Sequence, residues 1–318
     1  MTDAEAQTLG TGADRTEADT TDFSAQLTAH AARVETALRA LLPDDRGGPG
    51  EKALRAAMRY ATLNGGKRLR GFLTIETGRL CGADEDGAAR AGAAVECLHA
   101  YSLVHDDMPC MDDDDMRRGK PTVHKVWDEA TAVLAGDGLQ ALAFEILADP
   151  ATHQDGDVRA RLCLRLAQAA GVAGMVGGQA LDLGAETADA PLDGAGVKRL
   201  QALKTGALID VSAEMGAILG GASEAETGRI RGYARALGEA FQIADDLLDV
   251  TGTEAETGKR VGKDAGAGKA TFVDILGIDG ARQRAQDLVA EAAAQLAPFG
   301  DRAAHLIAAA RFAGERRS

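Results

Sequence analysis

Apolar residues recur every three or four positions along most of this sequence, which is the spacing of one face of an α-helix. Asp22 precedes the first series and is expected to cap its helix. The series themselves contain Phe23, Leu27, Val34, Leu38 and Leu41, then Val197, Leu200, Leu203, Val211, Met215 and Ile218, and finally Leu237, Phe241, Ala244 and Leu248. Aromatic residues make up only 3% of the chain, whereas strands prefer aromatic and β-branched residues. The pattern predicts an all-α protein of roughly ten or more helices.

Gly- and Pro-containing segments separate the predicted helices, but no internal repeat and no shift in composition marks a second domain. We therefore expect one helical domain over residues 23–318. Residues 1–22 are rich in Thr, Asp and Glu and have neither a basic nor an apolar stretch, so we expect a disordered acidic lead-in rather than a targeting peptide. The sequence has no run of about 18 apolar residues, and we expect no membrane span.

The cysteines and the net charge bear on compartment and partners. Cys81, Cys97, Cys110 and Cys163 form neither a CxxC pair nor a zinc-like spacing with histidines, so we expect free thiols and a cytoplasmic protein. The formal net charge is −14 at pH 7, the reverse of a general nucleic-acid-binding protein, and we expect no nucleic-acid partner. A polyanionic ligand would have to meet local basic residues or metal ions.

Six carboxylates and then three cations lie within the fifteen residues from Asp106 to Lys120. A solvated charged segment and an EF-hand loop are two ordinary interpretations. However, the run follows directly on an apolar helix, and it lacks the Gly and terminal Glu of an EF-hand. Pro109 cannot donate the hydrogen bond that a continuous helix needs. We therefore expect the helix to end near Met108 and Asp112 to return on a loop.

A second acidic cluster contains Asp245, Asp246 and Asp249. Asp245 and Asp249 are one helical turn apart, about 40° around the axis, so both can face the same ion. Facing carboxylates repel one another unless cations lie between them. Mg²⁺ uses few protein carboxylates and completes its octahedron with waters and substrate oxygens. Two such clusters therefore indicate divalent cations shared with a phosphate-bearing ligand.

Basic residues suited to the same ligand lie elsewhere in the chain. Lys67 and Arg70 follow the pair Gly65-Gly66 and share one helix face. Residues 204–206 (Lys-Thr-Gly) interrupt a regular helical series, which favours a kink and frees a carbonyl group. A Gly-rich basic loop containing Lys259 follows the second acidic cluster.

Taken in order, these segments resemble the trans-isoprenyl diphosphate synthases, most closely the short-chain bacterial farnesyl diphosphate synthases. The resemblance covers about residues 25–300, and six ordered motifs are far more specific than any one of them. The motifs are residues 65–70, the DDxxxxD of 106–112 with the basic residues after it, 174–182, 204–206, 241–249 and 262–264.

The resemblance implies a large helical bundle around a deep central cavity, with both acidic clusters across its mouth. It implies that three Mg²⁺ ions are held by Asp106, Asp107, Asp112, Asp245, Asp246 and Asp249. It places the diphosphate of an allylic substrate on Arg117, Lys204, Thr205, Gln242 and Lys259, and isopentenyl diphosphate on Lys67, Arg70, His99 and Arg118. The Lys204 carbonyl, the Thr205 hydroxyl and the Gln242 amide would act as catalytic groups beside the allylic carbon.

The implied reaction condenses dimethylallyl or geranyl diphosphate with isopentenyl diphosphate. Diphosphate leaves readily once metal ions and fixed cations neutralise its charge. The isopentenyl double bond would attack the resulting allylic carbocation, and the departing pyrophosphate would remove the proton. A dry, apolar cavity would keep water away from the cation.

Chain length is expected to depend on Tyr101, five residues or about 7.5 Å along the helix before Asp106. In the family that the chain resembles, a bulky aromatic residue here stops elongation at farnesyl length, and we assign this role to Tyr101 with its neighbour Ser102. Core packing is the alternative for Tyr101 and for His99. We expect His105 to be a structural residue at the helix end.

Two positions depart from the family pattern. Gly71 stands where Pro is common, which concerns local helix geometry only. The C-terminal residues do not match the family's basic tail, which leaves the roles of Arg316 and Arg317 open.

We therefore expect a farnesyl diphosphate synthase, with a geranylgeranyl diphosphate synthase as the alternative. A class I terpene cyclase shares the helical fold but lacks an isopentenyl site, so Lys67, Arg70 and Arg118 argue against it. An inactive partner subunit typically loses residues of the acidic clusters, and none is lost here. The family usually forms homodimers through helix faces, and the Ala-lined helix faces of this chain permit one.

Overall fold

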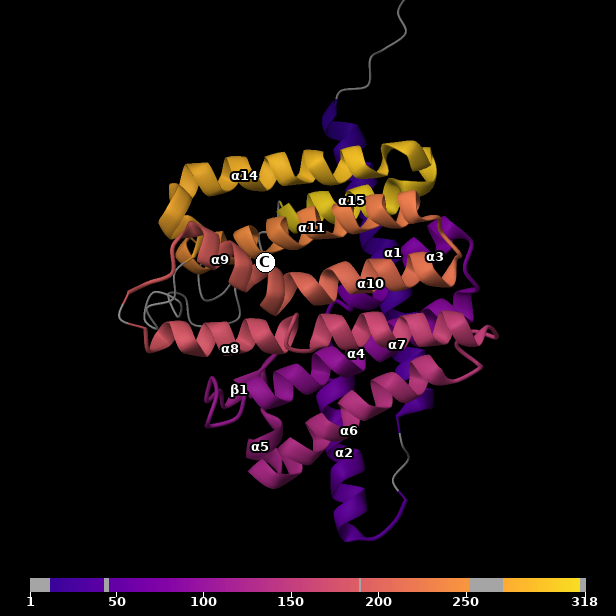
Figure 1. Cartoon of the computed structure of the whole chain (residues 1–318), viewed down its shortest axis with the longest axis vertical. Helices are drawn as coiled ribbons and strands as arrows, with labels where there is room; N and C mark the ends of the chain where they lie inside the picture. The colour runs from indigo at the N-terminus through magenta and orange to yellow at the C-terminus, as the bar shows by residue number, and fades with distance from the viewer. Residues whose placement is uncertain (1–11, 43–45, 189, 252–270, 315–318) are drawn as a thin grey trace, which may run out of the picture.

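Helices make up most of the described part of the chain, as the spacing of apolar residues predicts (Figure 1). The computed structural model describes residues 12–42, 46–188, 190–251 and 271–314. The α-helices are α1 (Gly12–Leu41), α2 (Pro49–Leu63), α3 (Leu69–Cys81), α4 (Glu85–Asp106), α5 (Val123–Val126), α6 (Glu129–Ala148), α7 (Gly156–Ala170), α8 (Met175–Glu186), α9 (Gly194–Gln201), α10 (Ala207–Leu219), α11 (Glu224–Thr251), α14 (Phe272–Leu296) and α15 (Ala304–Gly314). The remaining elements are the π-helix η1 (Ala202–Gly206), the 3₁₀-helix η2 (Ala297–Ala303) and the short strands β1 (Met116–Arg117) and β2 (Lys120–Pro121). The fold is a single-domain helical bundle, as expected.

The first helix starts earlier than the sequence predicts. It begins at Gly12 rather than at Asp22, and Ala13, Glu17 and Ala18 are residues that favour a helix. Phe23, Val34 and Leu38 are buried, as their spacing predicts. Residues 1–11 lie outside the described residues, so a disordered lead-in ending at residue 22 stays a prediction.

The helices pack in a continuous series in which α14 contacts α11, α11 contacts α10, α10 contacts α3, α3 contacts α4, and α4 contacts α6 (Figure 1). Two apolar clusters fill this bundle, one centred on α4 and α6 and the other on α11, α14 and α15. Helices α3 and α10 contribute side chains to both clusters and pack against each other, so they join the two parts of the core.

Small residues allow α3 and α10 to pack closely. A Cβ atom on Gly216 would lie 2.0 Å from Thr77 Oγ1, so only glycine fits there. The Thr74 hydroxyl of α3 donates to the carbonyl oxygen of Ser212 in α10 at 2.9 Å. Eleven of the thirteen residues of α10 are buried. An Ala- and Gly-rich sequence with few aromatic residues therefore forms a dense core by bringing helix backbones together.

Among the residues that the structure describes, one helix has the length and composition of a membrane span. It is α6, whose 18-residue window has a mean hydropathy of 1.3 and is 39% buried. The buried face of α6 packs on α4 in the core. Such a helix is weak evidence for a membrane span, because the core helix of a protein can have the same length and apolar composition.

Candidate active site

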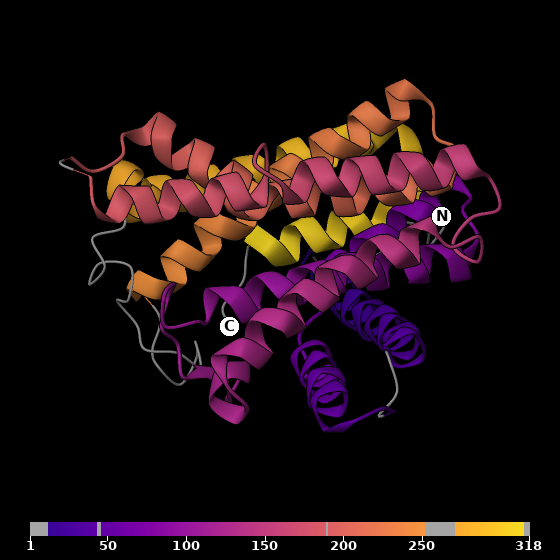
Figure 2. The ribbon, with the colours of Figure 1, turned by 60° about the horizontal axis from the view of Figure 1, so that its bottom comes forward.

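The elements that carry the predicted site residues meet at one end of the bundle. The C-terminal ends of α4 and α11 lie on the same side of the molecule as the β1–β2 hairpin, at the left in Figures 1 and 2. Each acidic cluster lies at or near the end of its helix. The fold thus brings segments about 140 residues apart in sequence to one end.

The first cluster begins where α4 ends. The helix stops at Asp106, and the Asp112 amide donates to the Asp106 carbonyl oxygen at 2.8 Å, which confirms the expected return of the loop. Burial raises the pKa of Asp106 to about 6, while Lys204 lowers it and the neighbouring Asp112 raises it further. A divalent cation between these carboxylates would relieve their repulsion, and carboxylate oxygens are ligands that suit Mg²⁺.

The Asp107 carboxylate is hydrogen-bonded to Arg117, a residue that is predicted to bind the allylic diphosphate. Asp107 is 3% exposed, and its carboxylate accepts hydrogen bonds from Arg117 Nε at 2.7 and 2.9 Å. Arg117 Nη2 also pairs with Asp107, and lies 3.8 Å from Asp114. These hydrogen bonds hold the Arg117 guanidinium at the end of α4. Both carboxylate oxygens of Asp107 thus accept hydrogen bonds from Arg117.

In the second cluster, on α11, one aspartate is likewise buried and hydrogen-bonded within the chain. Asp246 is 2% exposed, and its Oδ1 accepts from Gln242 Nε2 at 3.0 Å while its Oδ2 accepts from the Phe272 amide at 2.9 Å. Asp245 and Asp249 are half-buried one turn apart. Because the Gln242 nitrogen donates to Asp246, its amide oxygen faces away from that carboxylate. Asp246 thus joins α11 to the start of α14 and orients Gln242.

The interruption predicted at residues 204–206 is a π-helix. In η1, Lys204 Nζ donates to Asp182 Oδ2 of α8 at 2.6 Å. A Cβ atom on Gly178 of α8 would lie 2.3 Å from the Lys204 amide nitrogen, so α8 and η1 are in backbone contact. π-helical turns are rare and often mark functional sites. The predicted interruption of the helix is confirmed as this π-helical turn, and Thr205 lies within it.

The cationic residues gather around His99. Burial holds the pKa of His99 well below its usual range, and Arg70, Arg118, Arg117 and Arg68 lower it further. Burial also lowers the pKa of Arg70, with the Glu96 carboxylate opposing the shift and Arg118 adding to it, and the buried Arg70 Nε has no hydrogen-bond partner. A neutral imidazole among crowded guanidinium groups forms a site that an anion would stabilise.

The glycine pair before Lys67 allows an arginine from the hairpin to approach. Arg118 Nη1 donates to the Gly65 carbonyl oxygen, and a Cβ atom on Gly66 would lie 2.7 Å from that guanidinium. Arg118 and Gly119 connect β1 to β2 with φ values of 52° and 73°, as in a type I′ turn. Lys67 Nζ lies 5.0 Å from the centre of the Phe312 ring, a cation–π contact with α15.

Tyr101 is buried between α4 and α6. Its ring packs edge-on against His105 at 5.6 Å, and burial raises its pKa while a hydrogen bond with Gln140 of α6 opposes that shift. His105 Nε2 lies 3.0 Å from the Val133 carbonyl oxygen, which confirms a structural role at the helix end. The Ser102 hydroxyl donates to the His99 carbonyl oxygen at 2.9 Å.

Some predicted residues lie outside the described part of the chain, and some residues were missed. Lys259, Arg316 and Arg317 fall in the first group. Asp182 lies in the motif of residues 174–182, but the sequence pattern assigned it no role. An acidic residue in this Gly-rich segment could have been paired with Lys204. Glu96 was also missed, and its carboxylate accepts from the Gly71 amide at 3.1 Å. Pro at position 71 could not make that bond, so Gly71 has a local reason.

Two cavities of the described chain bear on the deep central cavity that the resemblance implies. A cavity of about 630 Å³ lies against η1, and α7, α9, α10 and α11 form its other walls. None of the predicted site residues that the structure describes lines it. A small pocket beside Asp107 and Arg117 has about 30 Å³. A deep cavity between the acidic clusters stays a prediction.

All four cysteines have free thiols, as expected. Burial raises the pKa of the Cys81 thiol to about 11 and that of Cys97 to about 12, so neither is ionised near neutral pH. Cys110 is exposed on the loop after α4.

Comparisons with known proteins agree with this arrangement. Residues 51–303 match the family described as polyprenyl synthetase. Farnesyl diphosphate synthase from Escherichia coli is 48% identical over 241 residues, covering 74% of this chain and 79% of that protein. Geranylgeranyl pyrophosphate synthase 11 from Arabidopsis thaliana is 43% identical over 296 residues, covering 92% and 81%. An FPP/GFPP synthase structure from Zymomonas mobilis is 47% identical with a TM-score of 0.84, covering 92% of this chain and 99% of that one. The chain therefore belongs to the polyprenyl synthetase family and is a short-chain prenyltransferase.

Proposed function

We propose that this chain is a farnesyl diphosphate synthase that condenses dimethylallyl or geranyl diphosphate with isopentenyl diphosphate. The observation that carries the proposal is the pairing of two self-repelling groups at one end of the bundle. Carboxylates crowd around Asp106, and guanidinium groups crowd around His99. Divalent cations relieve the first repulsion and diphosphates relieve the second.

Within this proposal, Asp106, Asp112, Asp245 and Asp249 hold Mg²⁺ ions, with about three per site. When bound, these ions neutralise the diphosphate as its bond to carbon breaks. Asp107 and Asp246, predicted as ligands, position Arg117 and Gln242 instead, because their oxygens accept hydrogen bonds in the folded chain. Arg117, Lys204 and Lys259 bind the allylic diphosphate. Lys67, Arg70, His99 and Arg118 bind isopentenyl diphosphate.

Oriented dipoles stabilise the allylic carbocation in this scheme. Gln242 keeps its amide oxygen available, because Asp246 accepts from its nitrogen at 3.0 Å. The Thr205 hydroxyl and the Lys204 carbonyl lie in η1, whose π-helical turn departs from ordinary helical hydrogen bonding. These oxygens carry partial negative charge yet are weak nucleophiles, so they stabilise the cation without capturing it.

Product length distinguishes this proposal from geranylgeranyl diphosphate synthesis. That alternative is supported by relatives named as geranylgeranyl pyrophosphate synthases. The buried ring of Tyr101, tied to α6 through Gln140, supports a bulky stop below Asp106. Purified chain incubated with Mg²⁺, geranyl diphosphate and labelled isopentenyl diphosphate should yield mainly farnesyl diphosphate by chromatography. A mainly geranylgeranyl product would refute the assignment. Hydrocarbon release without isopentenyl uptake would indicate a cyclase, and no turnover would indicate a partner subunit.

Replacing Tyr101 tests the chain-length role directly. Tyr101→Ala opens space beneath the first cluster, and products longer than those of the unmodified chain are expected. Tyr101→Phe keeps the ring and loses only the hydroxyl group, so it is the matched control and should leave the product profile unchanged. An unaltered profile in the alanine variant would mean that Tyr101 only packs the core.

We also propose a homodimer and a cytoplasmic location. Leu134 of α6 and Leu164 of α7 are 54% and 55% exposed, and the two helices contact one another. Exposed apolar side chains on adjoining helices favour burial by a second copy. The four free thiols suit a reducing compartment.

A further inference from the structure

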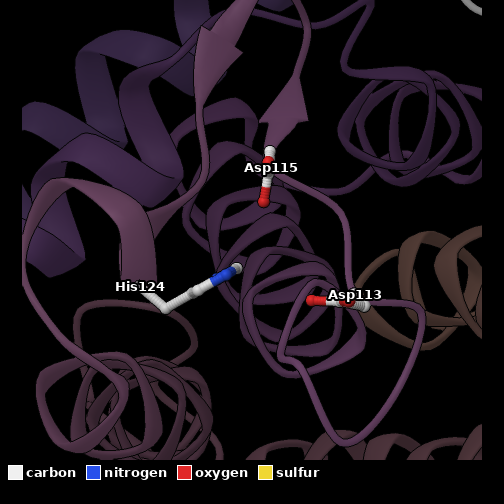
Figure 3. A group of neighbouring side chains, drawn as sticks. All are labelled: Asp113, Asp115 and His124. Carbon is white, nitrogen blue, oxygen red and sulfur yellow. The ribbon is translucent and has the colours of Figure 1, made fainter.

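Three side chains around the β1–β2 hairpin form a cluster that the proposed reaction does not use. One carboxylate oxygen each of Asp113 and Asp115 and one ring nitrogen of His124 lie within 4.8 Å of one another. Figure 3 shows the His124 imidazole directed between the two carboxylates. Both aspartates are exposed, whereas His124 is 8% exposed.

The histidine of this cluster has a ring nitrogen without a hydrogen-bond partner. His124 Nδ1 lies 3.2 Å from Thr122 Oγ1, and that hydroxyl donates to the Asp115 carbonyl oxygen at 3.4 Å. In the tautomer with hydrogen on Nδ1, the ring donates to Thr122 Oγ1 and Nε2 carries the lone pair. Nε2 is buried and has no hydrogen-bond partner. A metal-binding histidine commonly donates its other ring N–H in this way.

The hairpin holds the three ligand groups in place. The Thr122 amide donates to the Asp115 carbonyl oxygen at 3.0 Å, and the Asp113 amide donates to the Met108 carbonyl oxygen at 3.1 Å. Met116 pairs with Pro121 in the register of the strands. The carboxylates and the imidazole therefore come from opposite ends of one closed loop, and their separation does not depend on distant elements.

Lys125 occupies part of the cluster without filling it. Its Nζ lies 2.8 Å from Asp115 Oδ1, which leaves Oδ2 available, and its side chain is 43% exposed. A flexible exposed lysine can be displaced, because such surface pairs contribute little stability. The local charge is negative even with Lys125 in place, since Asp113 adds a second carboxylate.

From these observations we propose that Asp113, Asp115 and His124 bind a divalent transition-metal cation such as Zn²⁺, separate from the Mg²⁺ of the proposed reaction. Imidazole with carboxylates suits Zn²⁺ and Co²⁺, whereas Mg²⁺ prefers oxygen ligands alone. The bound ion closes the loop that carries Asp112, Arg117 and Arg118. The site is therefore a structural clamp next to the substrate residues.

Calorimetric titration of the full chain with Zn²⁺ in saturating Mg²⁺ tests this site. The unmodified chain should bind one Zn²⁺. The Zn²⁺ affinity should fall at least about tenfold in His124→Gln and in Asp113→Asn. It should fall about 10- to 100-fold in Thr122→Val, because His124 Nδ1 loses its partner. Asp114→Asn makes the same charge change in the same loop without touching the cluster, so its Zn²⁺ affinity should match that of the unmodified chain.

Co²⁺ identifies the ligands independently. The absorption spectrum of the Co²⁺-loaded chain should show nitrogen and oxygen coordination, and His124→Gln should change it. Because the two aspartates are exposed, Asp113→Asn should leave the circular dichroism spectrum unaltered, which separates lost binding from lost folding. Equal Zn²⁺ affinity in the His124 variant would overturn the proposal, as would a thiolate charge-transfer band that disappears in Cys110→Ser.

Discussion

Adjacent aspartates in each acidic cluster have different surroundings. Asp107 and Asp246 are 3% and 2% exposed and accept hydrogen bonds within the chain, whereas Asp106 and Asp245 are half-buried. Neighbouring helical residues point about 100° apart, so both members of a pair cannot face the same cleft. At the scale of the residue, each DD pair thus has one aspartate that is buried and hydrogen-bonded within the protein and one that is half-buried.

Replacing Asp107 tests this division. Asp107→Asn removes the charge that holds Arg117, so we expect the KM for the allylic diphosphate to rise about tenfold, as the loss of a charge-assisted hydrogen bond predicts. The Mg²⁺ concentration for half-maximal activity should not change. The matched Asp106→Asn variant should instead raise that concentration. Steady-state kinetics measure both quantities, and a common Mg²⁺ effect in the two variants would make Asp107 a metal ligand.

At the scale of the element, the contact between α8 and η1 positions the segment that we propose to be catalytic. Gly178 lies against the Lys204 backbone, and Asp182 lies one turn further along and pairs with the Lys204 ammonium. The spacing of apolar residues from Val197 to Ile218 predicts a helix here. The residue types at 204–206 (Lys-Thr-Gly) predict the interruption of that helix at η1. The role of α8 was not predicted, because sequence spacing gives no contact between separate helices.

A pair of glycine variants in α8 tests that contact. Gly178→Ala places a Cβ atom 2.3 Å from the Lys204 amide nitrogen, so the helices must separate, and kcat should fall at least about tenfold. Gly184→Ala lies in the same helix with nothing within 4 Å of its new Cβ atom. It should leave kcat unchanged and raise stability by up to about 1 kcal/mol. Equal kcat in both variants would contradict a positioning role for this contact.

At the scale of the whole molecule, a buried carboxylate connects both ends of the chain to its centre. Glu76 of α3 is 1% exposed and binds His30 of α1 at 2.6 Å, Arg79 at 2.8 Å and His305 of α15 at 3.3 Å. Burial alone would raise the pKa of Glu76, but hydrogen bonds from His30 and Arg79 lower it to about 2. Glu76 is thus ionised throughout the neutral range and joins α1, α3 and α15.

Glu76 makes the free energy of unfolding depend on pH in the acidic range. Its pKa falls from 4.5 to about 2 on folding, so it stabilises the folded chain above pH 4.5 by up to about 3 kcal/mol, and this contribution is lost as the pH falls toward 2. Glu76→Gln should be about 2 kcal/mol less stable than the unmodified chain at pH 7, and the difference should shrink in acid. Glu35→Gln, which removes a pair with Arg39 at the surface, should change stability by less than about 0.5 kcal/mol. Urea unfolding at several pH values measures these differences, and a pH-independent difference would contradict the role of Glu76.

The proposed dimer is also a property of the whole molecule. Leu134→Asp places a charge on the exposed apolar face of α6, so the chain should sediment as a monomer. Ile275→Asp, at an exposed apolar residue of α14, is the control and should keep the dimer. Analytical ultracentrifugation distinguishes the two states, and a monomeric unmodified chain would disprove the dimer.

The sequence by itself determined the helical class, the return of Asp112 after Pro109 and the interruption at η1, because each depends on local spacing, a missing amide hydrogen or a glycine. It also identified the family through six ordered motifs. Only the tertiary structure decided which aspartate of each pair is buried, that Asp182 meets Lys204, and that guanidinium groups from two segments surround His99. These features depend on contacts between residues distant in sequence, and helix packing sets those contacts rather than the local pattern.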